Sequence, residues 1–255
     1  MFALFPSRTV ALVLFGFPIH WYGIFYLAAF LVAIIVVQRL QHWRNLSLTR
    51  DEWISLVASA VLGVLIGGRI GFVLFYEPEY FLANPMKIFA VWEGGMASHG
   101  GFLGVIVAMY LHAVRNHLPK ARVADMAAVP AAIGLALGRV GNFVNQELYG
   151  TVTTLPWGMR IPGVEGLRHA LPLYDAILSL CIALICYLHL RTSKRSGSTL
   201  GLFFMLYGVM RFFLEFIRAQ QYPLTTILGL EMTRGQLLTI PIFLTGLIMM
   251  IVFYQ

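Results

Sequence analysis

Charged residues are scarce in this chain. They make up 11% of its 255 residues, whereas a soluble domain of ordinary composition carries about a quarter. No polar stretch is long enough to form a separate soluble domain, and apolar side chains account for 59% of the sequence. These shortages exclude an ordinary soluble protein and predict an all-α, polytopic membrane protein with one integral-membrane domain over residues 1–255.

Cysteine and basic runs are also nearly absent. The two cysteines, Cys181 and Cys186, lie in one apolar run without a second Cys/His pair, so neither a metal site nor a cofactor is expected. The net charge of +7 is not gathered in a basic run or an aromatic-interleaved patch, so no nucleic-acid binding is expected. No cleavable signal peptide is evident, and the first span is expected to act as the uncleaved signal.

Apolar segments dominate what is present. A membrane-spanning helix needs about twenty apolar residues, and seven segments qualify: 20–38, 53–76, 95–114, 123–145, 173–190, 199–217 and 236–253. The apolar piece before Pro18 is too short to span and is expected at the membrane interface. Residues 146–172 are expected to form an irregular loop, and residues 77–94 a short surface helix.

Basic residues are distributed unequally between the two sets of loops. Nine follow the first, third and fifth segments, and four lie on the alternate side in the loops that precede the sixth segment. The nine are Arg39, Arg44, Arg50, Arg115, Lys120, Arg122, Arg191, Lys194 and Arg195, and the four are Arg8, Lys87, Arg160 and Arg168. The positive-inside rule therefore predicts the N-terminus outside and the C-terminus in the cytoplasm.

Three arginines fall inside the apolar segments, namely Arg69, Arg139 and Arg211. A charge at the centre of a membrane helix costs about 2.5–3.5 kcal/mol on insertion scales and commonly marks function. Arg69 lies among glycines spaced four apart in "GVLIGGRIGFVLFY", a pattern that predicts close packing on a neighbouring helix. Structural and functional roles both remain open for this arginine.

Tyr207, Arg211, Glu215 and Arg218 recur every three or four residues in "MLYGVMRFFLEFIR" and share one helical stripe. Arg211 and Glu215 are expected to pair, and this pair alone would explain both residues as a structural neutralisation. The additional arginine leaves the stripe positive, which favours the binding of an external anion.

The segment "GRVGNFVNQELYG", residues 138–150, places Arg139 and Asn142 on one helix face. Asn142 and Asn145 offer both hydrogen-bond donors and acceptors, and Glu147 could clamp Arg139 or a loop amide. Arginine grips phosphate through two parallel hydrogen bonds, so these residues indicate a site for a phosphate-like group.

His99 lies among glycines in "GGMASHGGFLG", which allow close approach to its ring. It is either a hydrogen-bonded structural group or a base, because imidazole accepts a proton near neutral pH.

The segment "GRVGNFVNQELYG" resembles the signature of the prolipoprotein diacylglyceryl transferases. Further blocks follow in that family's order: "HWYGIFYL", "GGRIGFVLFY", "WEGGMASHGG", "LPWG", "YGVMRFFLEFIR" and "GQLLTIPIFLTGLIMM". The resemblance implies transfer of the diacylglyceryl group of phosphatidylglycerol to the lipobox cysteine thiol of a prolipoprotein signal peptide, with release of glycerol phosphate. It also implies the bacterial cytoplasmic (inner) membrane, whose lipid surrounds the enzyme.

The resemblance also implies residue roles. Arg139 and Arg211 would hold the phosphate, and His99 would be the base or an orienting group. The remaining lipid-binding candidates are Asn142, Glu147, Tyr22, Tyr207, Glu215, Asn145 and Arg69.

The chain departs from the family pattern at two places. It has "RHALPLYD" where the family shows an "RHPSQLYE"-like segment, so Asp175 stands for Glu, and it has "TRGQ" before the last helix, which adds Arg234. These changes are expected at the substrate entrance, outside the arginine–asparagine core.

Three alternatives stay open. "RHALPLYD" motivates a divergent member that acts on another lipid or acceptor. The arginines also suit an anion transporter or channel, although no internal repeat is visible. An intramembrane protease is disfavoured, because Ser98 lies in no nucleophile motif.

Overall fold

The computed structural model describes residues 9–220, 224–227 and 230–254, apart from the side chains of residues 93, 98, 99, 227 and 254. The chain divides into two compact units. The small unit is Leu46–Val123, and the large unit comprises the segments before and after it. The expected single transferase domain stays a prediction.

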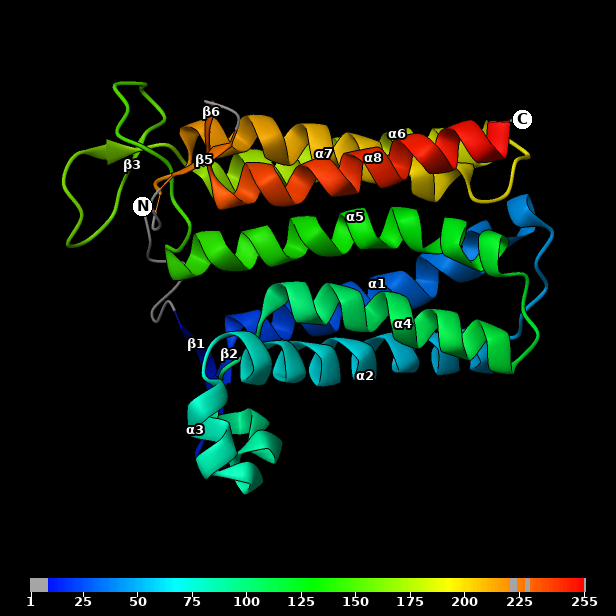
Figure 1. Cartoon of the computed structure of the whole chain (residues 1–255), viewed down its shortest axis with the longest axis horizontal. Coiled ribbons are helices and arrows are strands. Elements are labelled where there is room, and N and C mark those ends of the chain that lie inside the picture. Colours follow the sequence, from blue (N-terminus) through cyan, green and yellow to red (C-terminus); the bar gives the residue numbers. More distant parts are fainter. Residues whose placement is uncertain (1–8, 221–223, 228–229, 255) are drawn as a thin grey trace. The chain divides into compact units, whose positions relative to one another are not determined.

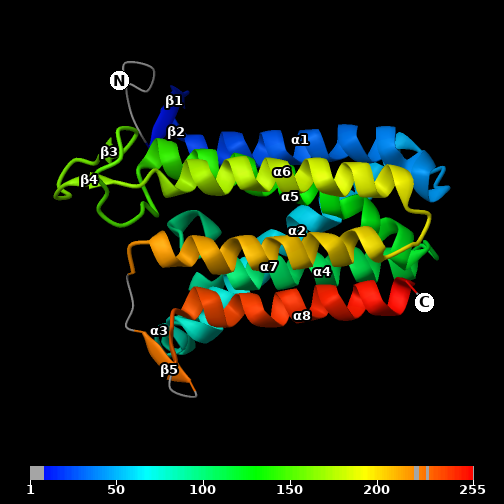
Figure 2. The same ribbon diagram turned by 90° about the horizontal axis from the view of Figure 1, so that it is seen from above.

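Six helices in the described part of the chain are long and apolar enough to cross a membrane (Figures 1 and 2). They are α1 (Trp21–Leu40) with the short helix η1 (Gln41–Arg44), α2 (Arg50–Phe75), α5 (Lys120–Asn145), α6 (Leu171–Thr192), α7 (Ser198–Leu214) with η4 (Glu215–Ile217), and α8 (Arg234–Tyr254). A further apolar helix, α4 (Ser98–Arg115), is shorter.

Each predicted span therefore corresponds to one helix, and the prediction of an all-α, multi-pass membrane protein is confirmed. The orientation of the termini stays a prediction.

In the small unit, α2 and α4 run side by side (Figure 1). A Cβ atom at Gly63 or Gly67 would overlap the backbone of Gly104, so only glycine permits this approach. The close packing predicted from the glycine spacing is confirmed. Residues 77–94 form the short helices α3 (Pro78–Ala83), η2 (Pro85–Phe89) and η3 (Val91–Glu93), in place of the single surface helix expected there.

In the large unit, α7 packs along α8 (Figure 2) and also contacts α6. Arg44 and Asp125, both buried, join the ends of four helices. Asp125 accepts the Nε–H of Arg44 at 2.6 Å and three backbone N–H groups of residues 197, 199 and 200 at 2.9–3.0 Å. Arg44 also donates to the carbonyl of Leu190 and the hydroxyl of Thr199. Arg44, which the sequence analysis counted among the loop charges after the first span, is thus buried in this network.

Three two-stranded hairpins belong to the large unit, the first before α1 and the other two between helices, and the sequence analysis did not predict them. They are β1 (Val10–Leu14) with β2 (Phe17–His20), β3 (Met159–Arg160) with β4 (Leu167–Arg168), and β5 (Thr225–Ile227) with β6 (Leu230–Met232). The first turn has positive φ angles at Phe15 and Gly16, as in the type I′ turn that matches strand twist.

Candidate functional site

The helix α5 ends in a tight reversal within the segment 138–150. The N–H of Glu147 donates to the carbonyl of Asn142 at 2.9 Å, and the N–H of Gln146 donates to that of Phe143 at 3.1 Å. This is a Schellman motif, in which glycine is the usual left-handed residue. Here Gln146 and Leu148 take φ angles of 58° and 54°. Such sparsely populated backbone is concentrated at functional sites, and the reversal returns Glu147 to the last turns of α5.

A polar network surrounds the end of α5. The amide Nδ2 of Asn142, a buried residue, donates to the hydroxyl of Tyr22 in α1 and, at 3.4 Å, to Glu147. Asn145 Nδ2 donates to the same carboxylate at 2.7 Å, and Arg139 Nη1 donates to Asn142 Oδ1 at 3.2 Å. Glu147 therefore binds two side-chain amides rather than the guanidinium group of Arg139.

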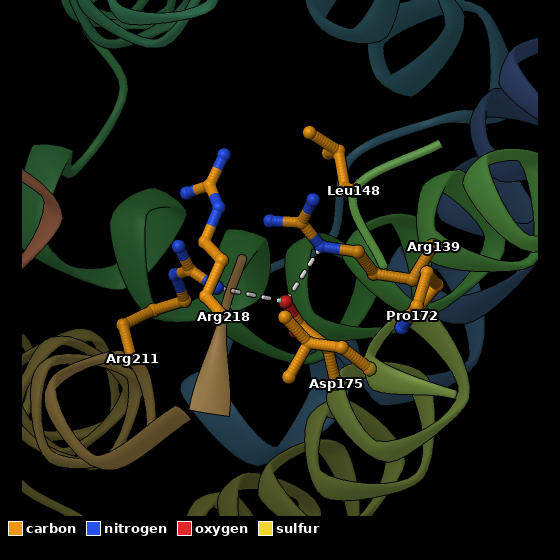
Figure 3. Close-up of a pocket in the computed structure, with 7 residues that line it drawn as sticks. Arg139, Leu148, Pro172, Asp175, Arg211 and Arg218 are labelled. Carbon is orange, nitrogen blue, oxygen red and sulfur yellow. Dashed lines mark hydrogen bonds and ion pairs between the residues drawn. The ribbon is translucent and has the colours of Figure 1, made fainter. Parts of the chain in front are cut away.

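Arg139 and Arg211 converge on one carboxylate oxygen, as Figure 3 shows. Asp175 Oδ2, on α6, lies 2.7 Å from Arg139 Nε and 3.2 Å from Arg211 Nη1. Arg211 also pairs with Glu215 at 2.9 Å, which confirms the predicted pair. Both carboxylates are at most 3% exposed, so each charge is neutralised within the protein rather than by water.

A third arginine completes the cluster. The helix α7 stops at Leu214, and after η4 the backbone at Arg218 is extended. The expected continuous stripe through residue 218 is therefore interrupted. Arg218 Nη1 lies 3.4 Å from Glu215, and the backbone bridges to Gly150 at the end of the signature segment. A Cβ atom at Gly150 would overlap the carbonyl of Ile217, so this bridge needs glycine.

These side chains enclose a small cavity. Its volume is about 10 Å³, and its lining consists of Arg139, Leu148, Leu171, Pro172, Asp175, Arg211 and Arg218 (Figure 3). A cavity of this size holds about one water molecule. Three guanidinium groups meet two carboxylates, so the cluster carries an excess positive charge. Arg139 uses its Nε for the ion pair with Asp175 and its Nη1 for the hydrogen bond to Asn142.

The tyrosines differ in their relation to this cluster. Tyr22 belongs to it through Asn142. Tyr207 stacks on Phe203 with ring centroids 6.0 Å apart, and it is not among the residues that line the described cavity. It lies one helical turn before Arg211.

Arg69 lies in the small unit, with its guanidinium group held by backbone carbonyls. It donates to the carbonyls of Lys87, Ile88, Ala90, Gly94 and Gly95, and it lies 5.0 Å from the ring centre of Phe81. This geometry favours the structural role over phosphate binding, because the N–H groups already have partners. The side chain of His99 lies outside the described residues.

The sequence analysis did not include Asp175 among the site residues, and it used Arg218 only as the additional positive charge of the predicted stripe. It placed "RHALPLYD" at the entrance, which is wrong for Asp175, since that residue is at the centre of the cluster and 2% exposed. One signal in the sequence pointed to a role for Asp175, because a carboxylate near the start of an apolar segment needs a cationic partner. The sequence did not show which arginine that partner is.

The chain is similar to known proteins over most of its length. Residues 9–252 match the family described as prolipoprotein diacylglyceryl transferase. A phosphatidylglycerol–prolipoprotein diacylglyceryl transferase of Geobacter sulfurreducens is 42% identical over 90% of this chain and 89% of its own length. Proteins of the same name from Methylibium petroleiphilum and Photobacterium profundum are 43% and 39% identical, over 93% and 100% of this chain and 92% and 96% of their own lengths. The chain belongs to the prolipoprotein diacylglyceryl transferase family.

Proposed function

We propose that this protein transfers the diacylglyceryl group of phosphatidylglycerol to the thiol of a prolipoprotein lipobox cysteine. The sulfur forms a thioether with the glyceryl carbon, the bond between that carbon and the phosphate oxygen breaks, and glycerol phosphate leaves with the electron pair. The thiol proton passes to a base, for which His99 is the proposed residue. This reaction is the first step of lipoprotein maturation.

The convergence of Arg139 and Arg211 on one point carries the proposal. Negative charge grows on the phosphate oxygen as the carbon–oxygen bond breaks, and fixed guanidinium groups stabilise that charge more in the transition state than in the bound lipid. The helices α5 and α7 fix the two groups 2.7 and 3.2 Å from the same oxygen. Asn142, which itself donates to Tyr22 and Glu147, accepts from Arg139 on its other side, and Glu215 accepts from Arg211.

The position of the cluster suits a lipid headgroup. Arg139 lies near the C-terminal end of α5, Asp175 near the start of α6 and Arg211 near the end of α7. The end of a membrane-spanning helix lies at the headgroup region of the bilayer, so all three residues would lie at that depth. With the predicted topology, this end faces the outer side of the bacterial inner membrane.

The test is an assay with purified protein, phosphatidylglycerol and a lipobox peptide, with released glycerol phosphate as the readout. Arg139→Ala and Arg211→Ala should each lower the rate by about a hundredfold or more, the effect of removing one transition-state donor. Arg160→Ala, an exposed arginine of β3, is the matched control and should retain the rate. Normal release by either cluster variant would contradict the proposal, as would anion flux into vesicles without phosphatidylglycerol turnover.

A further inference from the structure

Asp175 and Asp125 are both buried carboxylates paired with arginine in the large unit, yet they are held differently. The two oxygens of Asp125 accept one guanidinium and three backbone N–H groups, all within 3.0 Å. In Asp175, Oδ2 accepts from both arginines, while Oδ1 has, among the described residues, one partner, the hydroxyl of Ser179 at 3.4 Å. Both oxygens of Asp125 therefore accept short hydrogen bonds, whereas the short contacts of Asp175 are those with the two arginines.

The oxygen of Asp175 occupies the place that a phosphate oxygen would need. It lies between two guanidinium groups, the arrangement in which arginines bind carboxylate and phosphate alike. The cavity beside it has a volume of about 10 Å³, enough for about one water molecule. A phosphodiester cannot therefore contact both arginines while the carboxylate keeps its position.

The surroundings of Asp175 allow it to move. The side chains of Arg139 and Arg218, which line the cavity, are 20% and 25% exposed. Ser179 lies one helical turn further along α6 and already donates to Asp175 Oδ1. A change of rotamer would let the carboxylate keep this hydroxyl contact after it has left the arginines.

We propose that Asp175 is a positioning residue that exchanges with the lipid phosphate. Its carboxylate holds Arg139 and Arg211 in place in the empty site, yields them to the phosphodiester, and returns to them as glycerol phosphate leaves. This inference rests on the proposed function, because it takes the two arginines as the phosphate site.

Removal of the internal anion should strengthen binding and slow product release. Asp175→Asn leaves three guanidinium groups facing one carboxylate. If the carboxylate occupies the arginines nine-tenths of the time, its loss raises apparent anion affinity about tenfold. Glycerol phosphate should then bind about tenfold more tightly, and the steady-state kcat should fall by a similar factor while the first turnover stays fast. A residue with a merely structural role would lower the first turnover too and weaken anion binding.

The experiment measures glycerol phosphate binding, single-turnover rate and kcat for the full-length protein. Asp175→Glu keeps the charge and should behave nearly as the wild type. Asp125→Asn is the matched control, because it removes a buried carboxylate from an arginine elsewhere and should not tighten glycerol phosphate binding. Unchanged or weaker binding in Asp175→Asn would overturn the inference.

Two further measurements distinguish an error in the proposed phosphate site from an error in the proposed exchange. If Arg139→Ala and Arg211→Ala bind glycerol phosphate like the wild type, the proposed phosphate site itself is wrong. If Asp175→Asn does not fold, a structure of the wild-type protein with glycerol phosphate decides: Asp175 should lie beyond about 4 Å from both guanidinium groups, the limit of an ion pair. Intact pairs beside bound glycerol phosphate would overturn the exchange.

Discussion

Four buried or half-buried arginines are held in three ways, and the difference separates the arginines that we propose as structural from those that we propose as functional. Arg44 meets a saturated carboxylate and backbone carbonyls. Arg69 meets five carbonyls and the face of Phe81. Arg139 and Arg211 share one oxygen of Asp175. In the last arrangement a small cavity lies beside the guanidinium groups.

At this scale we predict that Arg69→Ala loosens the segment that carries its five carbonyl partners, without changing glycerol phosphate binding. Loss of the guanidinium group should favour local opening by about tenfold, or ~1.4 kcal/mol. Limited trypsin digestion should then cleave faster after Lys87, whose carbonyl accepts from Arg69. Arg115→Ala, an exposed arginine at the end of α4, is the control. Normal digestion together with lost glycerol phosphate binding would restore the lipid-binding role of Arg69.

At the scale of elements, the contact of α2 with α4 depends on the small size of individual residues. Gly104 faces the backbone of Gly63, and an added Cβ would lie 2.9 Å from that residue's carbonyl carbon. A Cβ added at Gly101, three residues earlier on the same helix, would lie 3.6 Å or more from Val64. Two glycines of one helix thus have different packing requirements.

Gly104→Ala should therefore destabilise the protein, and Gly101→Ala should not. Overpacking typically costs about 1–3 kcal/mol, whereas alanine at an open helical position gains up to about 1 kcal/mol over glycine. Thermal unfolding in detergent measures both variants against the wild type. Equal melting temperatures for the two variants would show that the helices separate without cost.

The sequence predicted where the helices lie better than it predicted where they end and which side chains contact one another. Lengths of apolar runs located all seven apolar helices, because a membrane imposes that length. Hydropathy could not locate the end of α7 at Leu214, since apolar residues continue through Ile217. It also missed hairpins with strands of two to five residues. The signature segment identified Arg139 and Asn142, but the Asp175 contact depends on packing of α5, α6 and α7, which no local pattern encodes.

At the scale of the whole molecule, polar clusters mark both ends of the large unit. The same four helices contribute to each: α1, α5, α6 and α7 join Arg44 with Asp125 at one end and surround Asp175 at the other. The first cluster is closed by short hydrogen bonds, and the second encloses the cavity. The Arg44–Asp125 cluster therefore holds one end of the helix bundle rigid, and the cluster at the other end is where we propose that the ligand exchanges with Asp175.

We predict that these ends lie on opposite sides of the membrane, with the arginine cluster outside. Glu165→Cys, in the loop between β3 and β4, should react with a membrane-impermeant thiol reagent in intact cells. Lys194→Cys, between α6 and α7, should react only after permeabilisation. Both positions are exposed. The reverse labelling pattern would contradict the topology drawn from basic residues.

The pairing of Asp175 with both arginines also affects which anions the site binds. A soluble phosphate ion must displace the carboxylate of Asp175 through its own charge alone. A phospholipid brings two acyl tails, and each buried methylene adds roughly 0.8 kcal/mol of membrane attachment. Because the space between the arginines holds about one water molecule, any anion must first displace Asp175. A headgroup held in the membrane by its tails meets this free-energy cost more readily than a free ion does. Discrimination against the abundant small anions of the cell surroundings thus follows from an internal side chain, without any contact to the tails themselves.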